Sequence, residues 1–329
     1  MLTDPQRAAG HPFRIRYAAR AALQDEPLLA AFAIGNGPAD AAALRLPLPI
    51  HEGGLCQELW QGSGPVTRRE AYGAQIAEDG QLLAASWTLD EAEHGGIEAA
   101  AEAVYRRIAE LSADSGYPHL VKVWHYLGAI NETPDDGGRD DERYRRFCVG
   151  RAKALAPGQP LPAATAVGIQ ARPHELIVFL LAAKVEGIRI ENPRQVPAFE
   201  YPRAYGPVSP SFSRAMLMPW GQLFVSGTAA VVGHASCHPE NTGAQLRELV
   251  LNLDALVARA ESLGGQRLVP AALKIYVRHR DDLLEVEALA ARLFPIDCPR
   301  LTVLADISRA DLRVEVEALY EPLRAKAAP

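Results

Sequence analysis

Cysteine is scarce in this chain, and no two cysteines stand in a spacing that would bind a metal or support redox exchange. Only four occur among 329 residues, at Cys56, Cys148, Cys237 and Cys298. None is separated from the next by two residues, the spacing that many zinc sites and thioredoxin-like sites share. Disulfide frameworks are typical of small secreted domains, not of chains of this length. We therefore expect reduced thiols in a cytoplasmic protein.

Long hydrophobic runs and basic blocks are also missing. The longest apolar run, LIVFLLAAK at 176–184, is far shorter than the about 20 residues of a membrane-spanning helix. The N-terminus, MLTDPQRAAGHPFRIRY, has no apolar segment behind its charges, so it does not predict a secretory signal. The net charge is −6, whereas nucleic acids and membrane surfaces attract concentrated positive charge. We expect neither partner, and a local basic pocket for a small anion remains compatible with these numbers.

The chain does contain a repeated order of elements. Amphipathic and alternating patterns predict, in the first copy, helices at 95–112 and 141–155 and strands at 81–86, 120–131, 161–169 and 175–184. In the second copy they predict helices at 244–260 and 283–294 and strands at 222–227, 271–279, 299–307 and 311–319. Tyr126–Leu127 then falls on Tyr276–Val277, and Leu176 on Leu312. We predict an α+β fold of two tandem β-α-β-α-β-β units, with helices on one face of each mixed sheet.

The first part of the chain, about 70 residues, fits neither copy. Its runs FRIRYAARAAL and PLLAAFAIGN could add strands or cover an exposed sheet edge. We therefore divide the chain into an N-terminal extension at 1–70, a degenerate first unit at 71–190, and a proline-bearing connector with the catalytic second unit at 191–329.

The two copies differ at positions that could carry chemistry. The second copy has Glu315 where the alignment gives Phe179 in the first, and Arg300 where the first has Ala163. Arginine's planar fork suits bidentate binding of a carboxylate. Both charges also have a structural interpretation: Glu315 could be a solvent-facing strand residue, and Arg300 a surface charge beside a proline. The asymmetry favours a charged pocket in the second copy alone.

The order PRLTV before VEVEAL (299–303 and 314–319) makes each unit resemble the Rid (YjgF-like) fold. Members of that fold form small trimers with sites at subunit interfaces, with a functional glutamate at the position of Glu315 and a carboxylate-binding arginine at that of Arg300. A trimer ring contains three units and this chain supplies two, so we expect a monomer in which the extension covers the missing neighbour. A homo-oligomer remains an alternative.

The connector gives a more specific resemblance. The segments YGPVSPSFSRA (205–215), SGTA (226–229) and SRADLRVEVE (308–317) resemble the chorismatases, which split chorismate into pyruvate and a ring product. The resemblance implies that Glu315 protonates the enolpyruvyl methylene without a metal or redox cofactor. A carboxylic acid that donates near neutral pH needs a raised pKa, which burial can provide.

The same resemblance implies the groups that bind the substrate. Chorismate carries two carboxylates, so its pocket needs several cationic or hydrogen-bonding groups. The positions that match family motifs are Tyr205, Arg214, Gly227, Thr228 and Arg300, with Arg278 and Arg309 as further candidates. Glycine at 227 would allow close backbone approach to a ligand, or would serve only a tight turn.

Ser308 bears on the product. Relatives that make 3-hydroxybenzoate tend to have Cys at this position, and hydrolytic relatives that yield a dihydroxycyclohexadiene acid tend to have Gln. Ser308 resembles a third branch, from pigment-producing bacteria, that releases both 3- and 4-hydroxybenzoate. We therefore expect one or both hydroxybenzoates, and Ser308 could instead cap a turn before Asp311. Two other functions remain open, an imine deaminase of the Rid type and a non-catalytic protein that binds a small anion.

His234, Cys237 and His238 (GHASCHPE, 233–240) are residue types that can bind zinc. The spacing is irregular and no fourth ligand is evident. We expect a polar loop that leads to a helix capped near Thr242, and no metal.

Overall fold

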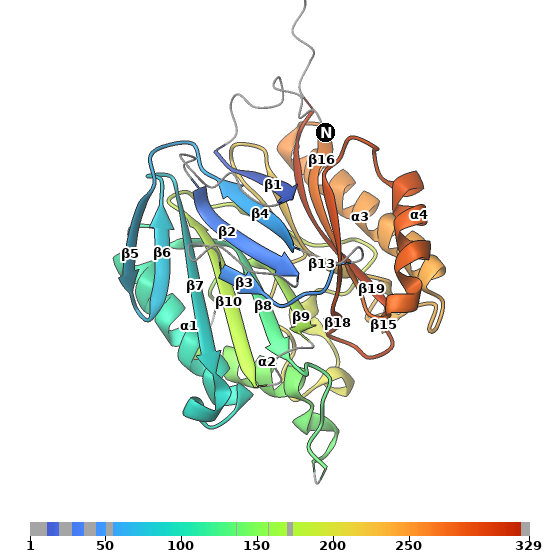
Figure 1. Cartoon of the computed structure of the whole chain (residues 1–329), viewed down its shortest axis with the longest axis horizontal. Helices are drawn as coiled ribbons and strands as arrows, with labels where there is room; N and C mark the ends of the chain where they lie inside the picture. The colour runs from blue at the N-terminus through green and yellow to red at the C-terminus, as the bar shows by residue number, and fades with distance from the viewer. Residues whose placement is uncertain are drawn as a thin grey trace, which may run out of the picture.

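The computed structural model describes residues 12–19, 28–35, 44–50, 55–135, 137–156, 158–169 and 174–323. Two sheets, each covered by helices on one face, lie on either side of a smaller N-terminal sheet (Figure 1). No helix in these ranges is both long enough and apolar enough to cross a membrane.

The first unit is a seven-stranded sheet with two helices. The strand order in this sheet is β18-β9-β8-β10-β7-β6-β5. The outermost strand, β18, belongs to the second unit of the chain. The unit's own elements are β5 (Thr67–Ala71), β6 (Ala74–Glu78), β7 (Leu82–Asp90), α1 (Ile97–Asp114), β8 (His119–Gly128), α2 (Arg143–Ala154), β9 (Ala163–Ile169) and β10 (Glu175–Ala183). The helices cover one face, with the buried stripe of α1 at Ile97, Ala101, Val104, Ile108 and Leu111.

The second unit repeats this arrangement in a six-stranded sheet of order β11-β12-β13-β19-β16-β17. Its elements are β11 (Ile188–Ile190), β12 (Ala215–Leu217), β13 (Leu223–Ala229), α3 (Thr242–Gly264), β16 (Leu268–Val277), α4 (Leu283–Leu293), β17 (Arg300–Leu304), β18 (Asp306–Ile307) and β19 (Val314–Pro322). Strand for strand, β5-β6-β7-β10-β8-β9 matches β11-β12-β13-β19-β16-β17. The predicted α+β fold of two repeated units is confirmed.

Helix ends follow ordinary capping chemistry. The Asn241 side chain accepts a hydrogen bond from the backbone N–H of Ala244 (2.9 Å) at the start of α3, one residue before the predicted cap at Thr242. Gly265 ends the helix in the left-handed region at φ 68°, where glycine avoids a steric cost. A two-stranded ribbon of β14 (Val231–Val232) and β15 (Ala235–Ser236) precedes this helix.

The N-terminal sheet has four strands in the order β1-β4-β2-β3: β1 (Arg14–Ala19), β2 (Leu28–Gly35), β3 (Leu44–Leu46) and β4 (Leu55–Gln61). It packs aromatic side chains against both units. The rings of Phe32 and Phe179 meet edge to face at 4.4 Å, and those of Phe13 and Phe224 lie 5.5 Å apart. The sheet thus covers the central faces of both larger sheets (Figure 1), whereas the sequence predicts added strands or cover for a sheet edge.

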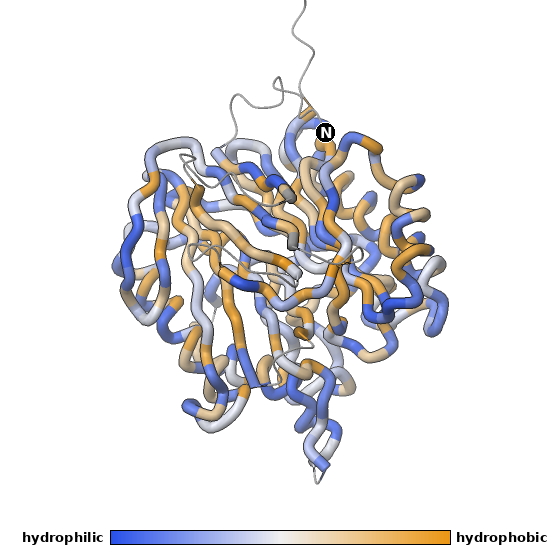
Figure 2. The backbone as a smooth tube through the Cα atoms, in the orientation of Figure 1, coloured by the Kyte–Doolittle hydropathy of each residue, from blue (hydrophilic) through white to orange (hydrophobic). Residues whose placement is uncertain are grey.

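The buried apolar residues form separate layers. One cluster lies under α1 and α2, another under α3 and α4, and a central cluster joins the three sheets. In Figure 2 hydrophobic residues follow the strands of the larger sheets, whereas hydrophilic residues are concentrated in loops and on the outer sides of the helices. Burial of these apolar faces is the main term that holds the layers together.

The strand register corrects two details of the sequence alignment. Arg300 pairs with Leu273 and Ala164 with the equivalent Val123, so Arg300 is equivalent to Ala164, not to Ala163. Leu127 pairs with Leu176, and its counterpart Val277 pairs with Val314. Leu176 is therefore equivalent to Val314, not to Leu312. By the same register, Glu315 is equivalent to Ile177, and Phe179 is the counterpart of Glu317 instead. A slip of two residues keeps every side chain on its original face, so alternation alone could not reveal the error.

Candidate active site

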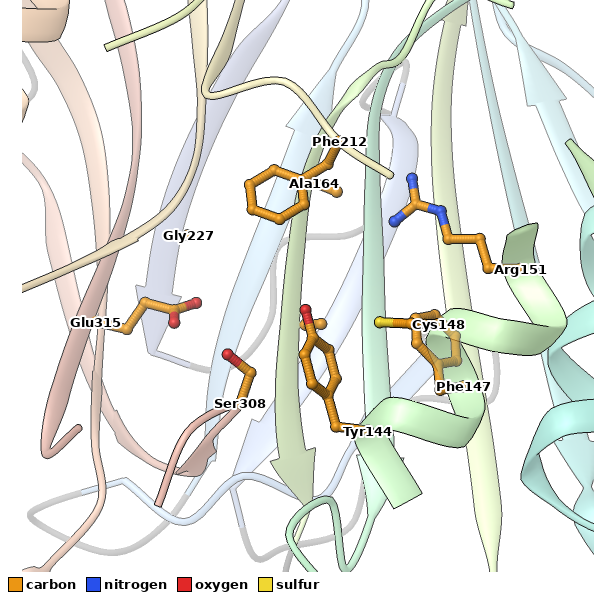
Figure 3. A pocket seen from close by; sticks show the side chains of 10 residues that line it. Tyr144, Phe147, Cys148, Arg151, Ala164, Phe212, Gly227, Ser308 and Glu315 are labelled. Carbon is orange, nitrogen blue, oxygen red and sulfur yellow. The ribbon is translucent and has the colours of Figure 1, made fainter. Parts of the chain in front are cut away.

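A cleft lies where the two units meet. The first unit contributes helix α2 and the edge strand β9, and the second contributes β13, β19 and the loop after β18. The residues that line it are Tyr144, Phe147, Cys148, Arg151, Ala164, Ala166, Phe212, Gly227, Ser308 and Glu315. Figure 3 shows Glu315 and Ser308 on one side of this space and the α2 side chains on the other.

Glu315 is the acidic group of the cleft. Its side chain is on the central face of β19, opposite Tyr276 and Ala229, and the residue is only 5% exposed. This position excludes the solvent-facing interpretation. Burial, and next the negative charge of Glu317, raise the pKa of Glu315 to about 8, against the opposing effect of Lys122, Arg214 and Arg278. Glu315 is therefore protonated at neutral pH and can donate a proton.

Gly227 makes room for this carboxyl group. A β-carbon at position 227 would overlap Oε1 of Glu315. The strand is irregular here, because the pairing of β13 with β19 shifts between Val225 and Thr228. The N–H of Gly227 donates to Oγ1 of Thr165 on β9 (3.1 Å), which ties the second unit to the first. The glycine thus allows close approach of Glu315 to the backbone.

A second carboxylate lies two residues along the same strand and has the opposite protonation state. Glu317 accepts hydrogen bonds from Lys122 (2.9 Å), Thr165 (2.6 Å) and Tyr276 (3.0 Å). Burial favours a higher pKa, but the charges of Lys122 and Lys274 outweigh it and hold the pKa of Glu317 at about 2. Two neighbouring carboxyl groups with pKa values pushed apart are typical of acid–base sites.

Arg214 stands close enough to Glu315 to lower its pKa. The residue is 6% exposed, and its Nη2 donates to the carbonyl of Val196 (3.0 Å) and to the hydroxyl of Tyr201 (2.6 Å). Its Nε is buried without a hydrogen-bond partner in the described structure. A buried guanidinium with a free donor suits an anionic ligand.

Tyr205 and Arg309 lie together beside Ser308. The guanidinium of Arg309 stacks over the Tyr205 ring at 4.1 Å and over the Tyr201 ring at 5.0 Å. Nη1 of Arg309 donates to the carbonyl of His234 (2.9 Å), and the Tyr205 hydroxyl lies 3.1 Å from Nδ1 of His234. The structure therefore brings these two predicted residues into one cluster next to the cleft.

Arg278 holds the loop that carries Ser308. It donates to the carbonyls of Ile307 (2.7 Å), Arg309 (3.0 Å) and Leu312 (2.8 Å) and to the side chains of Asn131 and Asp306. These bonds occupy Nε and both terminal nitrogens. The structure places Arg278 as a support of the loop, not as a group free to bind a ligand.

Two predicted binding residues point away from the cleft. Arg300 pairs with Leu273 on β16, so it shares a face with Leu304, which packs under α3 and α4. Leu301 and Val303 take the central face. The prediction that Arg300 lies in the pocket with Glu315 is thus contradicted by strand alternation. Thr228 also lies off the lining: its hydroxyl donates to the carbonyl of Ser226 (3.0 Å).

Arg151 lines the cleft and was not predicted. It is 4% exposed, its guanidinium lies 4.8 Å above the Tyr105 ring, and its Nε and Nη2 have no hydrogen-bond partner in the described structure. Gly150 allows α2 to approach α1, since a β-carbon there would overlap the carbonyl of Glu98. The available signal was an arginine four residues after Phe147, on the apolar face of a helix.

Tyr144 and Phe212 were also missed. Both line the cleft, and the Tyr144 hydroxyl points into it (Figure 3). Burial raises the pKa of Tyr144 well above its usual value, so its phenol stays protonated. An aromatic residue in a helix or a connector is usually a packing residue, so neither position stood out from the sequence.

The considered metal ligands have other contacts. Nε2 of His238 pairs with Glu248 (3.0 Å), and His234 pairs with Tyr205. Within the part of the chain that the structure describes, no group of three or more His, Cys, Asp or Glu side chains is arranged to hold a metal ion.

Comparison with known proteins identifies the family. Residues 58–182 match the family model "Chorismatase FkbO/Hyg5-like, N-terminal". A 3-hydroxybenzoate synthase of Streptomyces hygroscopicus is 34% identical over 80% of each chain, and a chorismatase of Streptomyces rapamycinicus is 37% identical over 80% of this chain and 81% of its own. A crystal structure of a chorismatase superposes with a TM-score of 0.82 at 30% identity, covering 93% of this chain and 98% of the other. This chain belongs to the chorismatase family.

Proposed function

We propose that this protein cleaves chorismate to pyruvate and hydroxybenzoate, with Glu315 as the general acid. The observation that carries the proposal is a buried carboxyl group, whose pKa burial raises, facing a cleft with unpaired guanidinium donors. A family of chorismate-cleaving enzymes supplies the substrate class. In this role Glu315 transfers its proton to the terminal methylene carbon of the enolpyruvyl ether.

Protonation of that carbon leaves an oxocarbenium centre at the ether carbon, and Glu315 becomes a carboxylate. The bond between the ring carbon and the ether oxygen then breaks, and pyruvate leaves with that oxygen. Loss of the proton from the neighbouring hydroxyl-bearing carbon makes the ring aromatic and gives 4-hydroxybenzoate. If the ring hydroxyl oxygen instead bonds to the vacated carbon, releases its former carbon, and the ring loses a proton, the product is 3-hydroxybenzoate. The carboxylate of Glu315 can regain a proton at this stage. Pyruvate and hydroxybenzoate together contain the atoms of chorismate, so no water is consumed overall. Water capture instead would give a dihydroxycyclohexadiene acid.

Two arginines fit the two carboxylates of the substrate. Arg151 is on the α2 wall with Nε and Nη2 unpaired, and Arg214 is near Glu315 with Nε unpaired. Charge-assisted bonds from buried guanidinium groups bind carboxylates firmly and fix their orientation. We assign Arg151 and Arg214 to this role, and Arg309, stacked on Tyr205, to the rim of the cleft.

The deaminase alternative depended on Arg300 as the holder of an imino-acid carboxylate. Arg300 faces away from Glu315, so it is not placed to hold that carboxylate, and the two unpaired arginines match the two carboxylates of chorismate better than the single carboxylate of an imino acid. We therefore retain chorismate cleavage as the proposed function.

The experiment is a pyruvate assay. Purified protein is supplied with chorismate, and pyruvate is measured by coupling to lactate dehydrogenase, with and without EDTA. We expect pyruvate release in both conditions, and chromatography should detect 3-hydroxybenzoate, 4-hydroxybenzoate or both. Folded protein that releases no pyruvate above background contradicts the proposal and favours a binding protein.

A further inference from the structure

Four buried charged side chains, contributed by strands of all three sheets, form one cluster. Glu58 comes from β4, Lys122 from β8, Lys274 from β16 and Glu317 from β19. Their side chains are between 2% and 7% exposed. Lys274 pairs with Glu58 at 2.6 Å and with Glu317 at 3.1 Å, and Lys122 pairs with Glu317 at 2.9 Å. Each sheet therefore contributes to one connected ion-pair network.

The network is balanced, with two ammonium and two carboxylate groups. Burial tends to lower the pKa of Lys122, and Glu317 opposes this effect. Burial has the same tendency at Lys274, but Glu58 and other neighbours raise its pKa well above the usual value. The surrounding phenols stay neutral, since burial raises the pKa of Tyr17, Tyr126 and Tyr276. Buried charges of this kind are stable only as a set, because removal of one leaves its partner unpaired.

The network is connected to the acid through Thr165 and Gly227. Glu315 and Glu317 are two residues apart on the central face of β19, which places their α-carbons about 7 Å apart. Thr165 donates to Glu317 (2.6 Å) and accepts from the N–H of Gly227 (3.1 Å). Gly227 is the residue against which the carboxyl group of Glu315 is packed. Ionisation of Glu315 would create a second negative charge beside Glu317 in a buried place.

We propose that this network adds to the effect of burial on the acid: Glu317 is a positioning residue that helps to keep Glu315 protonated by its fixed negative charge, and the N-terminal sheet takes part because Glu58 neutralises Lys274. The inference rests on the proposed function of Glu315 as a proton donor. It also assigns the N-terminal sheet an electrostatic role in addition to covering the units.

The other charged groups around Glu315 limit how far Glu317 raises the pKa of Glu315. Lys122 on β8, Arg214 before β12 and Arg278 after β16 all favour its ionised form, and Glu317 opposes them from the same strand. Removal of the Glu317 charge leaves only the cations, so the pKa of Glu315 should fall. Removal of the Lys122 charge should raise it. A neighbouring charge shifts a buried carboxyl group by about 1 to 3 pH units.

The test is the pH dependence of kcat/KM for pyruvate release. In the wild type the activity should fall as the pH rises through the pKa of Glu315. In Glu317→Gln this descending limb should move to lower pH by about 1 unit or more, with turnover recovering as the pH is lowered. In Lys122→Met it should move to higher pH. The proposal is overturned if the descending limb of the pH profile stays at the wild-type pH in both variants, or if it moves in the same direction in both.

Two further variants separate the electrostatic effect from misfolding. Lys122→Met combined with Glu317→Gln removes one charge of each sign, so its limb should lie between those of the single variants. Glu58→Gln should shift the limb toward lower pH, as Glu317→Gln does but by less. The assigned network is contradicted if the descending limb of the double variant lies at the same pH as that of Glu317→Gln. It is also contradicted if the descending limb of Glu58→Gln lies at the wild-type pH.

A readout that needs no turnover distinguishes this inference from the proposed function. Infrared difference spectra between wild type and Glu315→Gln report the carbonyl stretch of the protonated Glu315 carboxyl group. We expect that band at neutral pH in the wild type, and its loss at lower pH in Glu317→Gln than in wild type. Absence of the band in wild type at neutral pH overturns the inference even if chorismate is cleaved.

Discussion

Strand β10 of the first unit and strand β19 of the second occupy the same place in sheets of the same strand order. The central face of β10 presents Ile177 and Phe179, which pack against the N-terminal sheet. The equivalent positions of β19 are Glu315 and Glu317, which face the cleft and the ion-pair network. One copy has become a structural wall, and the other has kept the ionisable groups.

The division extends to the rest of the site. The first unit contributes Arg151 and the alanines of β9, which form the side opposite the acid. Neither unit alone therefore contains the complete cleft, although the two share one strand order.

The largest effect should come from the acid itself. Glu315→Gln keeps the shape of the side chain but has no carboxylic proton to donate. Turnover should fall by about 10²- to 10⁴-fold, while binding of product changes little. Pyruvate release and product binding by calorimetry measure the two quantities, and Glu287→Gln on α4 is the matched control. Turnover near wild type in Glu315→Gln would reduce Glu315 to a structural residue, like Ile177 in the other copy.

The same variant has a signature in stability. Unfolding lowers the pKa of Glu315 from about 8 to its ordinary value of 4.5, so the folded state binds the extra proton between these values. The wild type should therefore lose stability relative to Glu315→Gln as the pH rises from 4.5 to 8. Urea unfolding at several pH values measures this difference. A constant difference would mean that Glu315 is not a buried neutral acid.

On the first-unit side, Phe179→Ala should destabilise the fold. Phe179 is 3% exposed and packs on Phe32 at 4.4 Å and near Trp60. Removal of a buried aromatic ring costs about 3–5 kcal/mol, whereas Leu284→Ala, at a position 69% exposed, should change stability by about 0.5 kcal/mol or less. Urea unfolding compares them. Equal stability of the two variants would mean that the packing of Phe179 against the N-terminal sheet does not stabilise the fold.

Arg151 tests whether the first unit contributes to the chemistry. Arg151→Met should raise KM and lower kcat/KM by about 10- to 100-fold, because a charge-assisted hydrogen bond is worth about 1.5–3 kcal/mol. Arg146→Met, on the exposed side of the same helix, is the control and should remain near wild type. Steady-state kinetics with chorismate measure both parameters. Equal KM and kcat/KM in the two variants would mean that Arg151 does not bind the substrate and that the second unit alone supplies the binding groups.

Much of the fold was predictable, because periodicity is a local property of the sequence. The four helices and the central strands lie where amphipathic and alternating patterns place them. Glu315 was found from the difference between the copies and from motif resemblance. Its equivalence to Phe179 was wrong by two residues, since a two-residue slip preserves the alternation.

The rest of the site depends on how distant segments approach each other. The face taken by Arg300 is set by its pairing with Leu273, which no local motif reports. Arg151 enters the cleft only because Gly150 lets α1 and α2 pack closely. The network of Glu58 and Lys274 joins residues more than 200 positions apart. Such contacts are properties of the tertiary structure.

The smallest expected effect concerns Ser308, which sits at the boundary between the units. Its carbonyl accepts from Asn131 of the first unit (3.3 Å), and Arg278 holds the carbonyls on either side of it. The backbone is thus fixed without the Ser308 hydroxyl, which points toward Glu315 on the same side of the cleft (Figure 3). A change of this side chain should leave the acid in place and alter only its surroundings.

We predict that the wild type releases both 3- and 4-hydroxybenzoate and that Ser308→Cys changes their ratio without abolishing pyruvate release. The competing exits start from one protonated intermediate, so about 1.4 kcal/mol between their barriers changes the ratio tenfold. One hydrogen bond to a water or to the ring hydroxyl is worth that much. Chromatography of the products from Ser308→Cys and Ser308→Gln measures the ratio. If both variants keep the wild-type ratio, Ser308 does not determine the product, and the ratio depends instead on the side of the cleft formed by α2, where Tyr144 and Phe147 line the same space.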